Sequence, residues 1–226
     1  MNSIVTTLTT VAHFSAKGTE RFLLQKSWDN SKPTLAVIMM APSIAEGIAM
    51  DNTTLLVLNN AFRLGYGSVA IVNLFAKLND FALKEAEAED EENLKAILAA
   101  AQAADAVVYA PGVGKAKSKA FQCRQEQVLT ALQPMEDKLF CLCNEEGNAR
   151  LQHPLSPAVR NWCLSPLKLS ELLPQAKEAP SQKKKAASKP KERAAKERKS
   201  KETVAAEIVP LIIPREEPKA PDEPMP

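Results

Sequence analysis

Three short motifs place residues that can do chemistry directly after an apolar run or a turn. They are Met40-Ala41-Pro42-Ser43, Val72-Asn73-Leu74-Phe75-Ala76 and His153-Pro154-Leu155-Ser156-Pro157. The carboxamide of Asn73 suits the edge of a nucleobase, and it can equally pair with the backbone of a neighbouring loop. The imidazole of His153 can stabilise an oxyanion or exchange a proton near neutral pH, or it can simply occupy a surface loop. The Pro42-Ser43 turn can present backbone N–H groups to an anion or carbonyl, or it can be an ordinary turn.

A fourth motif, Gly112-Val113-Gly114-Lys115, resembles the end of a phosphate-binding loop. It lacks the upstream glycine that a Walker-type loop requires, which argues against a nucleotide-dependent transferase. Gly112 can still allow close approach of the backbone to a ligand after the preceding apolar run. We therefore include Gly112 among the expected substrate-binding residues.

Four apolar runs alternate with stretches long enough for helices. The runs cover residues 35–39, 69–72, 106–110 and 139–142. This alternation predicts an α/β fold, a three-layer sandwich whose central sheet is mainly parallel and has about four strands. Residues 22–28 can add an antiparallel edge strand.

Three helices are expected between these strands. The first is capped by Thr53 or Thr54 and carries Leu55, Leu58 and Phe62. The second is the acidic stretch from Glu85 to Ala104, and the third runs from about Ser118 to Leu132. The carboxyl ends of parallel strands lie along one edge of the sheet, and an open α/β sheet forms its ligand crevice at that edge. The expected substrate-binding residues there are Pro42, Ser43, Asn73, Phe75, Gly112 and Ser156.

Composition divides the chain of 226 residues into two parts. Residues 1–174, the expected α/β domain, hold 16 Lys+Arg and 18 Asp+Glu, whereas residues 175–226 hold 13 and 9. No apolar run approaches the length of a membrane span and the N-terminus lacks signal-peptide features, so we expect a soluble cytoplasmic protein. The four cysteines show no CxxC spacing, so we expect neither a disulfide scaffold nor a metal site.

Residues 175–226 form a low-complexity segment rich in lysine and proline, which we expect to be largely disordered. Between residues 181 and 201 there are ten Lys or Arg and two Glu. Such a run is either a solvated spacer or an electrostatic arm whose contacts to nucleic acid weaken steeply with salt. The expected nucleic-acid-binding residues are Lys183, Lys184, Lys185, Lys189, Lys191 and Arg193. The apolar segment Ile208–Ile213 can dock a protein partner or pack back on the domain.

Residues from about Arg21 to Leu164 resemble a bacterial and phage family known only as a domain of unknown function. The resemblance rests on five motifs in order along the chain. They are Arg21-Phe22-Leu23-Leu24, Ala41-Pro42-Ser43, Asp51-Asn52-Thr53, Asn73-Leu74-Phe75-Ala76 and His153-Pro154-Leu155. That family implies no established activity.

A more distant similarity is to the uracil-DNA glycosylase superfamily. It implies that Asn73 reads a flipped base, that His153 stabilises the departing base, and that residues 155–160 meet the strand. The residue before the proline of the first turn, which activates water in several of those enzymes, is Ala41 in this chain. The nearest acidic candidates in sequence are Asp51 and Glu46, and we take Asp51 with His153 as the expected catalytic pair.

Two functions from different classes follow from these residues. The first is a nucleobase- or nucleotide-binding domain that resembles DNA glycosylases and can extend to cleavage of an N-glycosidic bond, without metal or other cofactor. The second is a catalytically silent module whose basic tail contacts nucleic acid or a protein partner. Ala41 and the slightly acidic domain favour the second function, because surfaces that bind duplexes are usually basic.

Overall fold

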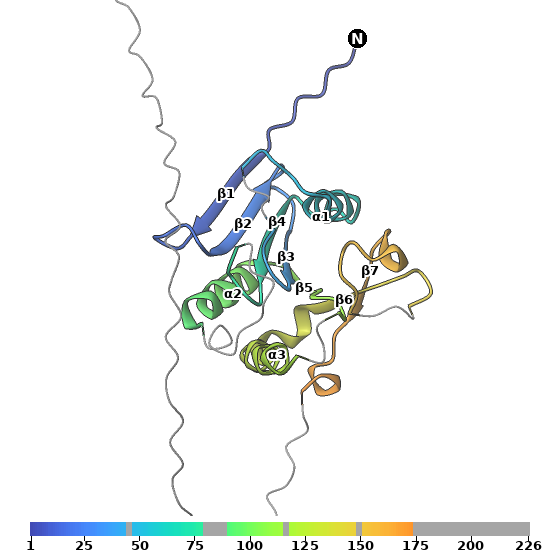
Figure 1. Ribbon diagram of the computed structural model, residues 1–226. Coiled ribbons are helices and arrows are strands. Elements are labelled where there is room, and N and C mark those ends of the chain that lie inside the picture. The colour runs from blue at the N-terminus through green and yellow to red at the C-terminus, as the bar shows by residue number, and fades with distance from the viewer. Residues whose placement is uncertain (44–46, 79–89, 115–117, 148–150, 174–226) are drawn as a thin grey trace, which may run out of the picture. The chain divides into compact units, whose positions relative to one another are not determined.

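The structure is a computed structural model that describes residues 1–43, 47–78, 90–114, 118–147 and 151–173 (Figure 1). The chain divides into two units, Met1–Glu178 and Ala179–Pro226, and every described residue belongs to the first. The domain boundary expected at residue 174 and the whole of the expected tail lie outside the described residues. Both remain predictions.

One mixed sheet of seven strands organises the domain, in the order β1-β2-β4-β3-β5-β6-β7. The strands are β1 (Thr9–Phe14), β2 (Arg21–Ser27), β3 (Thr34–Met39), β4 (Ser68–Asn73), β5 (Ala106–Tyr109), β6 (Leu139–Cys143) and β7 (Cys163–Pro166). The four expected strands are β4, β3, β5 and β6, and they pair in parallel at the centre. The antiparallel strands β1, β2 and β7 flank them. The prediction of a mainly parallel sheet of about four strands was therefore wrong, because the short or partly polar flanking strands lack long apolar runs.

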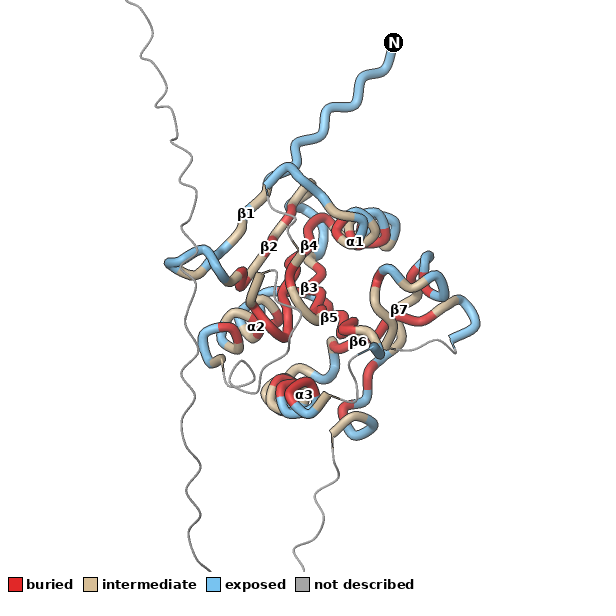
Figure 2. The backbone as a smooth tube through the Cα atoms, viewed as in Figure 1, coloured by how far each residue is buried: buried red, intermediate tan, exposed pale blue. Residues whose placement is uncertain are grey.

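The segment expected at residues 22–28 is indeed an antiparallel strand, β2, but it does not lie at the edge of the sheet. One side of β2 pairs with β4, and the other side pairs with β1. Strand β1 is mostly exposed, whereas buried residues fill the central strands (Figure 2). A buried lysine, Lys26, ties β2 to its surroundings by donating from Nζ to the Thr10 hydroxyl at 3.0 Å and to the Gly47 carbonyl at 2.6 Å.

In the described part of the chain the helices are α1 (Asn52–Arg63), α2 (Glu91–Ala103) and α3 (Lys119–Ala131), together with the short 3-10 helices η2 (Gln133–Lys138), η3 (Pro157–Val159) and η4 (Leu169–Glu171). Helix α3 has the expected bounds, with Ser118 accepting from the Phe121 N–H as the N-cap. Helix α2 begins at Glu91 after the cap residue Asp90, and part of the expected start at Glu85 lies outside the described residues.

Helix α1 corrects two details of the prediction. Its cap is Asp51 rather than Thr53 or Thr54, because the Asp51 carboxylate accepts from the Thr54 N–H at 2.7 Å. The expected apolar face was also wrong, since Phe62 is 65% exposed and the helix buries Val57 and Ala61 instead.

Two apolar clusters lie on opposite faces of the sheet. Side chains of α1 pack with Leu35 and Val37 of β3 in one cluster. Side chains of α2 and α3 pack with Ala36 and Ile38 of the same strand in the other. The alternation along β3 follows from the two-residue period of a strand, which sends successive side chains to opposite faces. One helical layer therefore covers each face of the sheet (Figure 1).

Candidate functional site

The segments that leave β3, β4 and β5 at their carboxyl ends begin side by side. The Leu74 N–H donates to the Met39 carbonyl at 2.8 Å and the Phe75 N–H to the Met40 carbonyl at 3.0 Å. The Ala110 N–H donates to the Ile38 carbonyl at 2.8 Å. The parallel ladder thus extends past the strand ends, and the segments that begin there, with Ser43, Asn73 and Gly112, lie at one edge of the sheet.

Asp51 lies at the centre of a polar cluster at this edge. Its carboxylate accepts from the Thr54 N–H and from the Ser43 hydroxyl, and the Arg21 guanidinium acts on it through its charge. Arg21 also donates from Nη1 to the Ser43 carbonyl at 3.1 Å. Burial raises the pKa of Asp51, but these hydrogen bonds and the Arg21 charge outweigh it, so the pKa lies below its ordinary value. Asp51 is therefore a carboxylate at neutral pH.

His153 lies near both Asp51 and Gly112. Burial lowers the pKa of His153, and the Asp51 charge only partly opposes that shift. Its Nδ1 accepts from the Leu155 N–H at 3.2 Å, so the neutral imidazole carries its proton on Nε2 and can donate from that atom. A Cβ built on Gly112 would lie 3.0 Å from the His153 Cβ, and Gly112 has a φ of +79°. Glycine at this position thus permits the approach of His153.

Asn73 presents a buried carboxamide that makes no hydrogen bond to any residue that the structure describes. It is 1% exposed, and both its Nδ2 and its Oδ1 lack a partner there. Asn73 alternates with Val69 and Ile71, which pack in the cluster under α1, so its side chain faces the α1 side of the sheet. An unsatisfied buried polar group costs about 1–3 kcal/mol. Of the two roles expected for this carboxamide, pairing with the backbone of a neighbouring loop is not seen among the described residues.

Two buried side chains hold the backbone next to Asn73. Asn93 donates from Nδ2 to the carbonyls of Asn73 and Leu74, both at 3.0 Å. Arg124, which is 0% exposed, donates from Nε to the Leu74 carbonyl at 2.8 Å. The main chain at this strand end is thus fixed while the Asn73 side chain is left for another partner.

The remaining expected residues occupy different environments. Pro42 is buried beside Ser43, and the Ser156 hydroxyl donates to Gln152 at 3.0 Å within the His153 turn. Phe75 is 2% exposed and packs in the cluster under α2 and α3, so it is a core residue here and its expected contact with substrate remains a prediction. Arg21 was not among the site residues expected from the sequence, although it opens the first of the five motifs.

A family model described as a protein of unknown function (DUF1643) matches residues 21–155. The chain belongs to this family. The match to DUF1643 begins at Arg21 and ends at Leu155, which are the first and last residues of the five motifs, and it confirms the resemblance to a domain of unknown function. No curated protein and no solved structure matches the chain. The similarity to uracil-DNA glycosylases remains a prediction.

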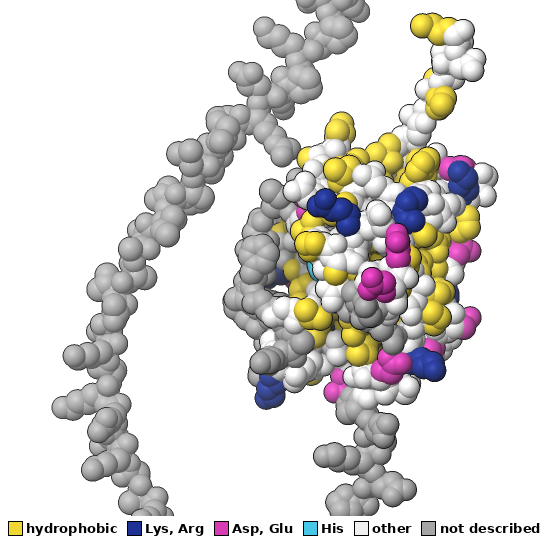
Figure 3. Space-filling view, turned by 90° about the vertical axis from the view of Figure 1, so that its right-hand side faces the viewer, with side chains coloured by type: hydrophobic (Ala, Val, Ile, Leu, Met, Phe, Trp, Pro, Cys, Tyr) yellow, Lys and Arg dark blue, Asp and Glu magenta, His cyan; other side chains and the backbone are white. Residues whose placement is uncertain are grey.

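The expected nucleic-acid-binding residues of this DUF1643 protein, from Lys183 to Arg193, and the Ile208–Ile213 segment lie outside the described residues. On the face of the domain seen in Figure 3, basic and acidic side chains are interspersed rather than separated by sign. Among the described residues, no group of three or more His, Cys, Asp or Glu is placed to hold a metal ion. Within the same residues, no helix has the length and apolar character to span a membrane.

We expect His153 to make the stability of the protein depend on pH. Its pKa in the folded protein lies below the ordinary value of 6.5, so the unfolded chain takes up the proton more readily. This contribution is fully present above pH 6.5 and is lost as the pH falls from there through the folded pKa. Melting temperatures should therefore fall between about pH 7.5 and about pH 5.

The variant His153→Asn keeps an acceptor for the Leu155 N–H and removes the titrating group, so it should flatten that pH dependence. His13→Asn on the exposed strand β1 is the matched control and should leave the dependence as it is in the wild type. An unchanged pH dependence in His153→Asn would show that other groups cause it.

Proposed function

We propose that the domain binds a nucleobase or nucleotide at the carboxyl edge of the sheet, between Asn73 and His153. The buried, unpartnered carboxamide of Asn73 is the observation that carries this proposal. A carboxamide supplies donors and an acceptor side by side, and a base edge presents the complementary pattern. The unpaired Asn73 carboxamide costs free energy in the protein without ligand, and a bound base would form two hydrogen bonds with it.

His153 supports the same assignment from the other side of the site. A neutral imidazole that donates from Nε2 can bind a carbonyl oxygen of a base without introducing a buried positive charge. The Arg21, Ser43 and Asp51 cluster holds the segment between β3 and α1 near this imidazole. Asn73 and His153 are thus assigned as substrate-binding residues.

Binding without catalysis is the form of this function that the Asp51 environment favours. Its carboxylate already accepts from Ser43 and Thr54, and its lowered pKa makes it a weak base toward water. Ala41 has no polar side-chain group that could act as the base in place of Asp51. Cleavage of an N-glycosidic bond would need an activated water, and Asp51 is the expected base for it. An assay for release of free base from single-stranded DNA and from nucleosides separates the enzyme from the silent binding module.

Replacing Asn73 with alanine should weaken binding of the preferred base by about tenfold or more, because two hydrogen bonds to the ligand are lost. The free energy of unfolding should change by less than about 1 kcal/mol, since the wild-type side chain has no partner to lose. Calorimetric titration with the five common nucleosides and their monophosphates, together with urea unfolding, measures both quantities.

Asn161→Ala is the matched control, because Asn161 is exposed. It should change neither affinity nor stability. Absence of binding by every nucleoside and nucleotide, or equal affinity in Asn73→Ala and the wild type, would refute the proposal.

A further inference from the structure

Two of the four cysteines lie directly opposite each other in neighbouring strands. Cys143 ends β6, Cys163 begins β7, and the two residues are register partners in this antiparallel pair. Side chains of directly opposite residues project from the same face of a sheet. The Cys143 thiol donates to the Cys163 carbonyl at 3.2 Å, so the Cys143 sulfur already points towards its partner residue. Both residues are thiols in this structure.

The register of the two strands sets the distance between these cysteines. The Leu167 N–H donates to the Leu139 carbonyl at 2.9 Å, which makes Leu139 and Leu167 a hydrogen-bonded pair. Hydrogen-bonded and non-hydrogen-bonded pairs alternate along an antiparallel ladder. Cys143 and Cys163 are an even number of positions further on, so they are also a hydrogen-bonded pair, with Cα atoms about 5.5 Å apart. Disulfides span Cα distances of about 4.4–6.8 Å, so the backbone places this pair within disulfide range.

A small movement is enough to join the two thiols. Opposite Cβ atoms of an antiparallel pair lie about 4.5–5.5 Å apart, and a disulfide brings them to about 3.5–4.5 Å. Strand β7 is the last strand of the described sheet and has four residues, so within that sheet it pairs with β6 alone. It can therefore move about 1 Å more easily than a central strand. Disulfides that depart from ideal geometry are the more easily reduced ones, so this pair suits reversible oxidation.

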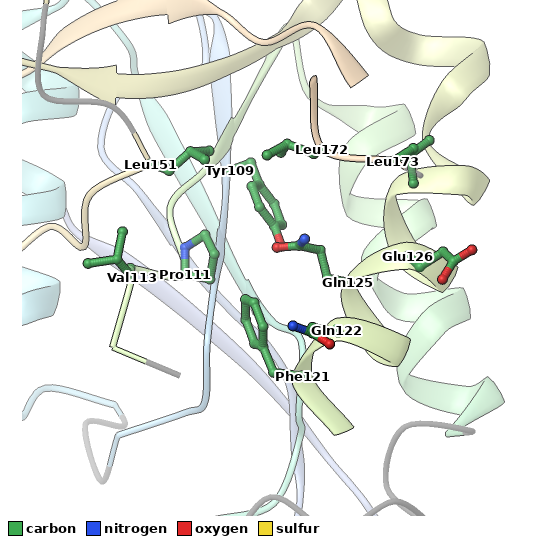
Figure 4. Close-up of a pocket in the computed structure, with 11 residues that line it drawn as sticks. Tyr109, Pro111, Val113, Phe121, Gln122, Gln125, Glu126, Leu151, Leu172 and Leu173 are labelled. Atoms are coloured by element: carbon green, nitrogen blue, oxygen red, sulfur yellow. The ribbon is translucent and has the colours of Figure 1, made fainter. Parts of the chain in front are cut away.

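The remaining two cysteines are placed differently. Cys141 is fully buried and is the register partner of Tyr109 in β5. Tyr109 lies under α3, where its hydroxyl donates to Oε1 of Gln125 at 3.0 Å (Figure 4). Cys141 is only a diagonal neighbour of Cys163, and diagonal neighbours are about 7–8 Å apart, beyond disulfide range. Cys123 is exposed on α3.

We propose that Cys143 and Cys163 form a reversible disulfide by exchange with a small disulfide such as oxidised glutathione. Cys163 is partly exposed and Cys143 is 4% exposed, so Cys163 reacts first. Its thiolate attacks one sulfur of the small disulfide, and one glutathione thiolate leaves. The Cys143 thiolate then attacks the Cys163 sulfur, and the second glutathione thiolate leaves. The cysteine pair loses two electrons to the small disulfide, and its two protons pass through solvent to the two glutathione thiolates.

The new bond closes the segment of residues 144–162, which carries His153 and helix η3. A cross-link that closes a loop of this length restricts the unfolded chain and thereby stabilises the folded one. The redox state of the surroundings thus sets how firmly the two ends of this segment are joined. The disulfide is independent of base binding at Asn73.

Peptide mapping of the full chain tests the pairing. Folded Cys123→Ser protein, which lacks the exposed thiol, is equilibrated with oxidised glutathione, quenched with acid, alkylated in denaturant and digested. We expect one cross-linked peptide that joins Cys143 to Cys163, an alkylated Cys141, and a loss of about 2 Da from the intact mass. The melting temperature of the oxidised protein should be higher by about 5 °C or more, and dithiothreitol should reverse both changes. Wild-type protein should give the same cross-link.

Cys143→Ser is the deciding variant, because it keeps the thiol that attacks first and removes the second. It should stop at the mixed disulfide and gain the mass of one glutathione on Cys163. Cys163→Ser leaves only buried thiols in the same Cys123→Ser background and should take up glutathione at least about tenfold more slowly. Unfolding curves of both variants verify that they fold.

Three results would overturn the inference: Cys143 and Cys163 both alkylated after equilibration of the folded protein, a cross-link between other cysteines, or a cross-link that forms only in urea. Unmodified Cys163 in Cys143→Ser would overturn the order of attack. An unchanged melting temperature in the cross-linked protein would overturn its stabilising effect. The mapping of the Cys123→Ser protein decides the pairing even if Cys143→Ser fails to fold.

Discussion

Replacing Gly67 with alanine is expected to destabilise the protein by about 3 kcal/mol or more. A Cβ built on Gly67 would lie 1.8 Å from the Asp29 carbonyl oxygen and 2.7 Å from the Lys32 Cβ. That oxygen belongs to a backbone segment that is itself bonded to Gly67, because the N–H groups of Trp28 and Asp29 donate to the Gly67 carbonyl. Moving the segment away to relieve the contact would therefore break these hydrogen bonds.

Urea unfolding monitored by tryptophan fluorescence measures this loss, since Trp28 lies beside Gly67 and Trp162 is buried in the cluster under α1. Gly114→Ala is the control, because a Cβ there meets nothing within 4 Å. If the free energy of unfolding changed by a similar amount in the two variants, the segment around Asp29 would be able to move away from the new Cβ without loss of stability.

Arg124→Met should cost about 3 kcal/mol of stability and weaken the base site at the same time. The Arg124 guanidinium donates to the Leu74 carbonyl at 2.8 Å and to the Asp90 carbonyl at 3.1 Å. Methionine fills a similar shape but donates nothing, so both acceptors lose the hydrogen bonds that Arg124 makes to them. Because Leu74 follows Asn73 directly, the strand end that presents the carboxamide also loses support.

The unfolding free energy and the affinity for a bound nucleoside should both fall in Arg124→Met. Arg160→Met changes an exposed arginine and should alter neither. If Arg124→Met lowered the stability by less than about 1 kcal/mol, the contacts of Arg124 would be dispensable for the fold.

The sequence predicts the central strands well because their signal is local. Strands β3 and β4 are buried on both faces, so residues 35–39 and 69–72 read as continuous apolar runs. Strand β1 has no such signal, since it is mostly exposed and mixes threonine with apolar residues. Strand β7 has four residues and ends at Pro166, and its place in the sheet comes from pairing with β6. Pairing between distant segments leaves no periodic pattern.

The same distinction applies to the candidate site. Strand ends are visible as polar residues after apolar runs, which is why the sequence located Ser43 and Asn73. The contact of Arg21 with Ser43 joins residues 22 positions apart, and nothing local to Arg21 indicates its partner. Asp51, Thr53 and Thr54 are all good caps by residue type, and only the geometry selects Asp51.

The order of strands in the sheet sets a waiting time during synthesis on the ribosome. Strands β1 and β2 emerge together, but the second neighbour of β2 is β4, and Ser27 pairs with Ser68, 41 residues later. At elongation rates of about 5–20 residues per second, that delay is about 2 to 8 seconds. A two-stranded hairpin alone is only marginally stable in water. The first two strands of the nascent chain therefore acquire lasting stability only when β4 has been made.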